Sequence, residues 1–266
     1  MLTSFNSDGF SVGSDGALNQ SSQTYVGWNW RGSNTTVSNT SGSITSTVSV
    51  NQDAGFSVLT YTGNGTTGAT VGHGLGKAPD FYWVRWRNNT SNYHVYHSSL
   101  GATKGMILNE TNSEATNAGF WNNTEPTSSV FSLGYYGGSN AGGGLFSAVC
   151  FTEIDGFSKF GSYTGNGSSD GTFVYTGFRP AYILFKRTDI SGDIWGILDS
   201  SRNTYNVVNR RLEAHNSSSE QSDYNIMDFL SNGFKLRDTD RSWNGSGGTF
   251  IYAAFAENPF KYALAR

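Results

Sequence analysis

The sequence contains a single cysteine, four prolines and three methionines among 266 residues, and only 14% of its residues are charged. Because Cys150 is the only cysteine, it forms no disulfide within the chain, which excludes a small secreted scaffold held by disulfides. The low charge and the net charge of -3 argue against an electrostatic grip on nucleic acid or on an anionic membrane. We therefore expect partners with neutral surfaces.

Long apolar runs are also missing from the sequence. No run approaches the roughly 20 residues that a membrane-spanning helix needs. Residues 1–6 do not show the basic and then apolar pattern of a secretory signal peptide. The sequence predicts neither membrane insertion nor a signal peptide.

Strong helix formers are sparse, whereas Gly, Ser, Thr and Asn are abundant. Aromatic residues make up 15% of the chain and supply the apolar area for a core. Aromatic and β-branched side chains fit pleated sheets well. This composition predicts an all-β protein with many polar turns.

One stretch of sequence occurs twice. Residues 55–65 read Gly-Phe-Ser-Val-Leu-Thr-Tyr-Thr-Gly-Asn-Gly, and residues 156–167 repeat them with one insertion. A second phrase, at residues 79–85, returns at residues 180–186. We interpret this as an internal duplication in which Tyr-Thr-Gly-Asn-Gly ends a strand in a turn, because Gly and Asn tolerate positive φ.

The N-terminal residues match the closing part of both copies. Residues 9–13 and 24–30 parallel residues 130–134 and 144–150, and again residues 233–237 and 249–255. We therefore expect residues 1–31 to be the closing strands of a preceding repeat. On this interpretation they complete a sheet or pair with a neighbouring copy, and the chain is part of a longer modular protein.

Alternation with a period of two marks the last strand of each copy. Aligning the copies places Trp30, Cys150 and Phe255 at one position, which predicts that Cys150 is a small buried hydrophobe and not a reactive thiol. The residues expected to face the core are Val26, Trp28, Trp30, Phe146, Ala148, Cys150, Ile251, Ala253 and Phe255.

Short strands separated by turns favour two tandem antiparallel β-sandwich units of the jelly-roll or concanavalin-like kind. The expected organisation is closing strands at 1–31, a linker and strand at 32–54, and β-sandwich repeats at 55–155 and 156–266. Strands are expected at 93–97, 105–109, 129–134, 144–152, 194–199, 205–208, 211–214, 233–237 and 248–256. One short helix is expected at 224–230, where Ile226, Met227 and Leu230 share a helical face.

No residue pattern in the sequence predicts catalysis or a cofactor. His94 and His97 are three residues apart, so on a regular strand they face opposite sides and cannot share a metal ion. A phosphate-binding loop and a His-Glu-x-x-His motif are missing. Carboxylates are present that a glycosidase pair would need, but the two copies do not place them alike. We expect a non-enzymatic protein without metal or cofactor.

Aromatic residues in polar loops that differ between the copies are the candidate ligand-binding residues. They are Trp121, Tyr135, Tyr136 and Trp243. Such rings stack on sugars or anchor a protein partner. The alternative is that they plug the ends of each sandwich or serve a contact between subunits.

Six phrases of the sequence resemble a domain of unknown function found in virion structural proteins of marine tailed bacteriophages. These phrases are residues 42–50, 69–76, 96–101, 159–167, 175–180 and 256–261. The resemblance implies a place in the virion and a structural or adhesive role in a tail-fibre-type appendage. It implies as partners further copies of the chain in a homotrimer, other virion proteins, and a glycan or protein of the host surface. It supplies no catalytic residues.

Two other classes of function stay open at this point. A polysaccharide-degrading appendage would need a carboxylate pair in a groove. A capsid-decorating protein or a structural spacer would bind no receptor.

Overall fold

The computed structural model describes residues 1–256. It divides the chain into two compact units, the first at Met1–Trp30 and the second beginning at Arg31. Strands make up 39% of the chain and helices 6%, in several antiparallel sheets. The prediction of an all-β chain is confirmed.

The first unit is a hairpin followed by one turn of helix. β1 (Leu2–Asn6) pairs antiparallel with β2 (Gly9–Val12). α1 (Gly16–Asn19) begins after Asp15, whose carboxylate accepts a hydrogen bond of 3.0 Å from the Ala17 backbone. Residues 24–30, expected to form a strand, belong to none of the described strands.

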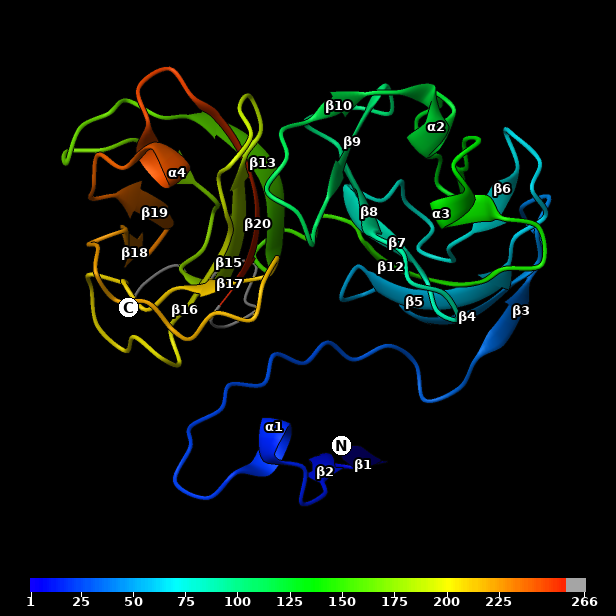
Figure 1. Cartoon of the computed structure of the whole chain (residues 1–266), viewed down its shortest axis with the longest axis horizontal. Coiled ribbons are helices and arrows are strands. Elements are labelled where there is room, and N and C mark those ends of the chain that lie inside the picture. The colour runs from blue at the N-terminus through cyan, green and yellow to red at the C-terminus, as the bar shows by residue number, and fades with distance from the viewer. Residues whose placement is uncertain (257–266) are drawn as a thin grey trace. The chain divides into compact units, whose positions relative to one another are not determined.

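The larger sheet of repeat 1 has eight strands in the order β10-β9-β8-β7-β12-β5-β4-β3, and two of them, β3 and β4, come from the segment at 32–54. The bounds of its strands are β3 (Val37–Asn39), β4 (Ser46–Asn51), β5 (Phe56–Thr62), β7 (Phe81–Trp86), β8 (Tyr93–His97), β9 (Lys104–Ile107), β10 (Ala115–Thr116) and β12 (Leu145–Phe151). A second, two-stranded sheet is formed by β6 (Thr70–Gly72) and β11 (Val130–Ser132). Figure 1 shows β5, β12 and β7 side by side.

Repeat 2 has the same order of strands in its larger sheet. Its five strands run β13-β20-β15-β16-β17, which matches β5-β12-β7-β8-β9 of repeat 1 position by position. Their bounds are β13 (Ser158–Thr164), β15 (Pro180–Arg187), β16 (Trp195–Asp199), β17 (Leu212–Glu213) and β20 (Thr249–Ala256). A three-stranded sheet contains β14 (Phe173–Tyr175), β19 (Gly233–Leu236) and β18 (Met227–Leu230).

The other helices are also single turns. They are α2 (Ala118–Trp121), α3 (Gly137–Asn140) and α4 (Arg241–Asn244). α3 and α4 come just before the central strands β12 and β20, as α1 comes just before residues 24–30. The Asp240 carboxylate caps α4 by accepting from the Ser242 backbone at 2.8 Å, as Asp15 caps α1.

The sheet register corrects the alignment of the closing strands. Cys150 lies opposite Tyr82, and Ala254 lies opposite the counterpart of Tyr82, Ile183. The residue that matches Cys150 is therefore Ala254, and the expected match with Phe255 is wrong by one position. Cys150 is fully buried, and this burial raises the pKa of its thiol.

Contacts between the repeats explain why a second face of the closing strand is also buried. The Phe255 ring lies 5.4 Å from that of Phe151, measured between centroids. The Trp195 indole donates a hydrogen bond of 2.8 Å to the Ile107 carbonyl, and His97 Nε2 lies 3.1 Å from the Tyr252 carbonyl. Burial lowers the pKa of His97 to about 4, so its ring is neutral at pH 7.

Two further expected elements differ from the structure. The helix expected at 224–230 is wrong, because Met227–Leu230 forms β18 and pairs with β19. Pairing within a hairpin overrides the helical spacing of the apolar residues there. The strand expected at 205–208 is reduced to one isolated bridge between Val208 and Met227.

Candidate functional site

The Tyr-Thr-Gly-Asn-Gly segment of each repeat binds the short helix that precedes the closing strand. In repeat 1 the Tyr61 hydroxyl donates to the Ser139 carbonyl at 2.7 Å. The Asn64 backbone donates to Asn140 Oδ1 at 3.1 Å, and the Gly65 backbone donates to the Asn140 carbonyl at 2.9 Å. We call this set of contacts the clasp.

Repeat 2 forms the clasp with the same atoms. The Tyr163 hydroxyl donates to the Trp243 carbonyl at 2.8 Å. The Asn166 and Gly167 backbones donate to Asn244 Oδ1 at 3.0 Å and to the Asn244 carbonyl at 2.8 Å. Both clasps lie in well-packed surroundings, since Asn140 is 3% and Asn244 0% exposed. The segment therefore holds the short helix in place and is not a ligand loop.

Glycine is required in the clasp because two backbones approach closely. A Cβ at Gly63 would lie 2.4 Å from the Ala141 carbonyl oxygen. A Cβ at Gly165 would lie 2.4 Å from the Gly245 carbonyl oxygen. Since no real Cβ comes so close to a backbone atom, the repeated glycine is explained by steric fit.

Two of the four aromatic candidates lie in the cores. Trp121 is 0% exposed and its ring meets Tyr82 edge-on at 4.8 Å. Trp243 is 1% exposed and meets Tyr224 edge-on at 5.0 Å. Neither ring offers a face to a ligand, because Trp121 belongs to the buried core cluster of repeat 1 and Trp243 to that of repeat 2.

The other two candidates are neighbours at the surface. Tyr135 is 60% exposed, Tyr136 is half-buried, and their ring centroids are 5.6 Å apart. Asn117 links them, because its Oδ1 accepts from the Tyr135 hydroxyl at 2.8 Å and its Nδ2 donates to the Tyr136 hydroxyl at 3.0 Å. Asn117 also caps α2 through the Gly119 backbone.

Tyr136 borders a hollow of about 340 Å³ that we call the His94 hollow. Strands β8, β9 and β10 and helix α2 supply most of its walls. The lining residues are Asn92, His94, Gly105, Met106, Ile107, Asn112, Ser113, Ala115, Phe120 and Tyr136.

A carboxylate fixes the amide groups on one side of this hollow. Glu110 accepts hydrogen bonds from Asn92 Nδ2 at 2.6 Å and from Asn112 Nδ2 at 2.5 Å. Asn92 Oδ1 accepts in turn from Asn109 Nδ2 at 2.9 Å. Each amide nitrogen carries a second hydrogen, so the fixed amides can donate to a ligand.

His94 and two aromatic rings also line the hollow. The His94 ring lies 5.5 Å from Phe120 and 5.9 Å from Tyr136, and Phe120 meets Tyr136 edge-on at 5.1 Å. Burial lowers the pKa of His94 to about 4, so the ring carries no charge at pH 7. His94 Nδ1 is buried and has no hydrogen-bond partner among residues 1–256.

Repeat 2 fills the corresponding space. Val84 lies opposite His94, and their counterparts Phe185 and Gly196 lie opposite each other. A Cβ at Gly196 would be 2.3 Å from the Phe185 ring, so that ring occupies the place of the histidine. The His94 hollow therefore lies where the two copies have diverged. Sequence reasoning gave His94 no role in a site, although the change from His94 to Gly196 between the copies could have indicated one.

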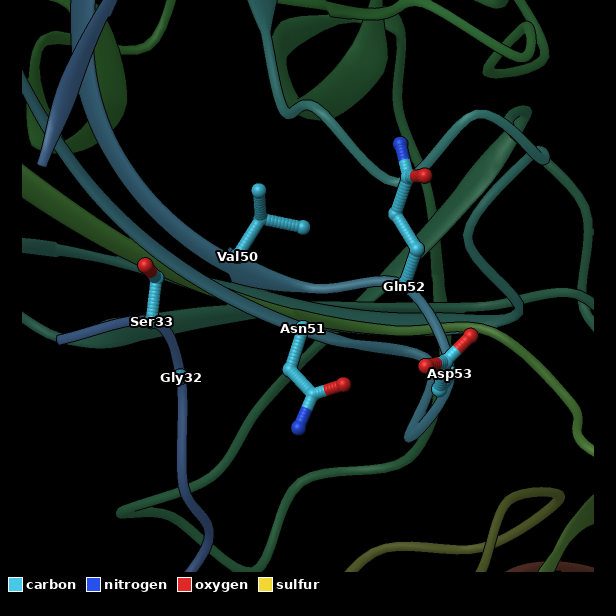
Figure 2. Close-up of a pocket in the computed structure, with 6 residues that line it drawn as sticks. All are labelled: Gly32, Ser33, Val50, Asn51, Gln52 and Asp53. Carbon is cyan, nitrogen blue, oxygen red and sulfur yellow. The ribbon is translucent and has the colours of Figure 1, made fainter. Parts of the chain in front are cut away.

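A second hollow, of about 510 Å³, lies beside β4 and is drawn in Figure 2. It is lined by Gly32, Ser33, Val50, Asn51, Gln52 and Asp53. The segment at Ser33 is tied to β4, because the Ser33 backbone donates to Ser49 Oγ at 3.0 Å. Figure 2 shows Asn51 pointing away from Val50 and Gln52, and no aromatic ring lines the space. We assign this hollow no function.

Within residues 1–256, no group of three or more His, Cys, Asp or Glu side chains is placed to hold a metal ion. The same residues contain no helix that is long and apolar enough to cross a membrane.

Comparison of the chain with curated proteins and with solved structures gives no match. One family model, described as a domain of unknown function (DUF7483), matches residues 1–259. The match includes the first unit and both repeats through to the closing strand β20. The chain belongs to the DUF7483 family.

Proposed function

We propose that the chain is a non-enzymatic structural module of a phage virion appendage of the tail-fibre type, and that repeat 1 binds a sugar of a host-surface glycan in the His94 hollow. The virion location is supported by the phrases that resemble phage virion proteins. One observation supports the sugar site: the hollow is lined both by amide groups that are held in place and by two aromatic rings.

The chemistry of the His94 hollow suits a neutral ligand with one polar and one apolar side. The half-buried Tyr136 provides a ring surface for the C–H face of a sugar, and Phe120, which is 4% exposed, packs edge-on against it. Asn92 and Asn112, both held by Glu110, provide donors for its hydroxyl groups. The volume of about 340 Å³ is at the small end of the roughly 300–1,000 Å³ found for ligand sites, which favours a single sugar unit.

The scaffold in this proposal is a pair of tandem β-sandwiches of the jelly-roll or concanavalin-like kind, at 55–155 and 156–266. The matching strand orders support it, as do two separate core clusters, one in each repeat. Assembly into a homotrimer with other virion proteins belongs to the same proposal. Phe173 and Tyr175 on β14 are 44% and 60% exposed and offer an apolar surface for such contacts.

A glycan array followed by calorimetric titration tests the sugar site. Replacing Asn112 by alanine (Asn112→Ala) is expected to weaken binding about tenfold through the loss of about 1.5 kcal/mol of hydrogen bonding. Because Asn112 is exposed, the melting temperature should not change. The matched control is Tyr205→Ala, which removes an aromatic ring of repeat 2 that is 83% exposed and should leave the affinity unchanged.

A double substitution tests the hollow itself. Val84→Phe together with His94→Gly copies the arrangement of Phe185 and Gly196 and should fill the space, which would abolish sugar binding in a folded protein. Retained binding in this variant would overturn the site. Absence of any array binding and of adsorption to host cells would overturn receptor binding as a whole, and release of shortened glycan would show an enzyme.

A further inference from the structure

The first unit carries the closing elements of a repeat. Its hairpin β1–β2, helix α1 and residues 24–30 follow one another as β18–β19, α4 and β20 do in repeat 2. The two hairpins align at Gly9 and Gly233, and the two helix caps align at Asp15 and Asp240.

Core side chains of these elements are exposed in the first unit and buried in repeat 2. The exposed fractions are 82% for Phe5, 44% for Phe10 and 44% for Leu18, against 2% for Phe229, 0% for Phe234 and 1% for Trp243 at the matching positions. Tyr25 is 51% exposed, whereas its counterpart Phe250 is 0% exposed. Exposed apolar surface of this kind indicates an interface.

Repeat 2 shows what covers these side chains. β20 lies between β13 and β15, and Phe250 stacks on Tyr163 with their ring centroids 4.8 Å apart. Tyr163 belongs to the Tyr-Thr-Gly-Asn-Gly segment that closes the clasp on α4. Residues 1–30 contain no such segment.

Helix α1 carries the residues that would accept the hydrogen bonds of this segment. Leu18 aligns with Trp243, whose carbonyl accepts a clasp bond in repeat 2. Asn19 aligns with Asn244, whose side-chain amide accepts another. Asn19 Nδ2 donates to the Gly13 carbonyl at 3.1 Å, as Asn244 Nδ2 donates to the Asp238 carbonyl at 2.8 Å. Asn19 is nevertheless exposed, whereas Asn244 is 0% exposed.

We infer that the first unit docks a polypeptide that carries the opening half of the same repeat, a segment homologous to residues 153–224. Its Tyr-Thr-Gly-Asn-Gly closes a third clasp on α1. Residues 24–30 then enter its sheet as the central strand between two strands of the partner, with main-chain hydrogen bonds on both sides. The occupant is an opening half and not an intact second copy of this chain, because the opening strands β5 and β13 are already paired with β12 and β20. This inference concerns assembly and does not depend on the sugar site.

An extended chain tests the inference. A second copy of residues 153–224 is placed before Met1, so that the order of elements continues as in repeat 2. Amide hydrogen exchange at residues 25–30 is compared with that of the chain of 266 residues. The extension should slow exchange at these amides at least about 100-fold, because they become central-strand donors.

The matched control is the same extension with Tyr163→Ala and Asn166→Ala in the added copy. These changes delete the side-chain contacts of the Tyr-Thr-Gly-Asn-Gly segment, the tyrosine hydroxyl bond and the bond that Asn166 Oδ1 accepts, and should reverse at least about tenfold of the protection. Equal exchange with and without the extension would overturn the inference. Concentration-dependent dimers of the unextended chain with protected amides at 25–30 would also overturn it, since the occupant would then be a second copy.

Discussion

Trp121→Ala is expected to lower the free energy of unfolding by about 3–5 kcal/mol, the usual cost of deleting a fully buried large aromatic ring. Trp121 is 0% exposed and packs against Tyr82 and Tyr96 at 4.8 and 6.2 Å. Trp243→Ala should have a similar effect in repeat 2, where the ring is 1% exposed. Urea unfolding followed by circular dichroism measures both.

Phenylalanine is the matched control at these two positions. The indole nitrogens of Trp121 and Trp243 have no hydrogen-bond partner in the described part of the chain, so Trp→Phe removes no hydrogen bond. It should cost less than half as much as alanine, because most of the ring volume remains. A Trp121→Ala protein that keeps its unfolding midpoint but loses glycan binding would restore the surface role first expected for this residue.

Asn244→Ala is expected to lower the free energy of unfolding by about 2–4 kcal/mol, because it leaves several buried groups without a partner. Asn244 Nδ2 donates to the Ser168 carbonyl at 2.7 Å and to the Asp238 carbonyl at 2.8 Å. Its Oδ1 accepts from the Asn166 backbone at 3.0 Å. The substitution therefore removes the clasp bond from the Asn166 backbone and leaves the Ser168 and Asp238 carbonyls without this donor.

Repeat 1 supplies the comparison for this second variant. Asn140 makes the same contact to Asn64 and donates to the Thr66 carbonyl at 2.8 Å, with fewer further bonds than Asn244. Asn140→Ala should therefore cost less than Asn244→Ala in the same urea titration. If both variants unfold at the midpoint of the unsubstituted chain, the clasp contributes nothing to stability.

The strands could be predicted where turn residues and alternation agree. The strand expected at 93–97 coincides with β8, and the one expected at 144–152 contains β12 with one extra residue at each end. Apolar spacing alone was misleading at 224–230, because the pairing of β18 with β19 is a hairpin contact that helical spacing does not reveal. Local pattern thus identifies strands and leaves the choice between short helix and strand to tertiary pairing.

The site was harder to predict, because exposure is a property of the fold. Trp121 and Tyr135 both occur in polar, unrepeated stretches, yet one is buried and the other is 60% exposed. The clasp joins Tyr61 to Ser139, 78 residues along the chain, and no local pattern reports such a contact. The His94 hollow is open because the residue paired with His94 is Val84. At the corresponding place in repeat 2, the larger Phe185 fills the space.

The duplication copied the clasp and left the His94 hollow free to diverge. Native-state amide hydrogen exchange at Gly65 and Gly167 tests this most directly, because these amides donate to the carbonyls of Asn140 and Asn244. Both are predicted to exchange only through global unfolding, at rates close to those of the central strands β12 and β20. Exchange of either amide at the rate of an open loop would contradict the account.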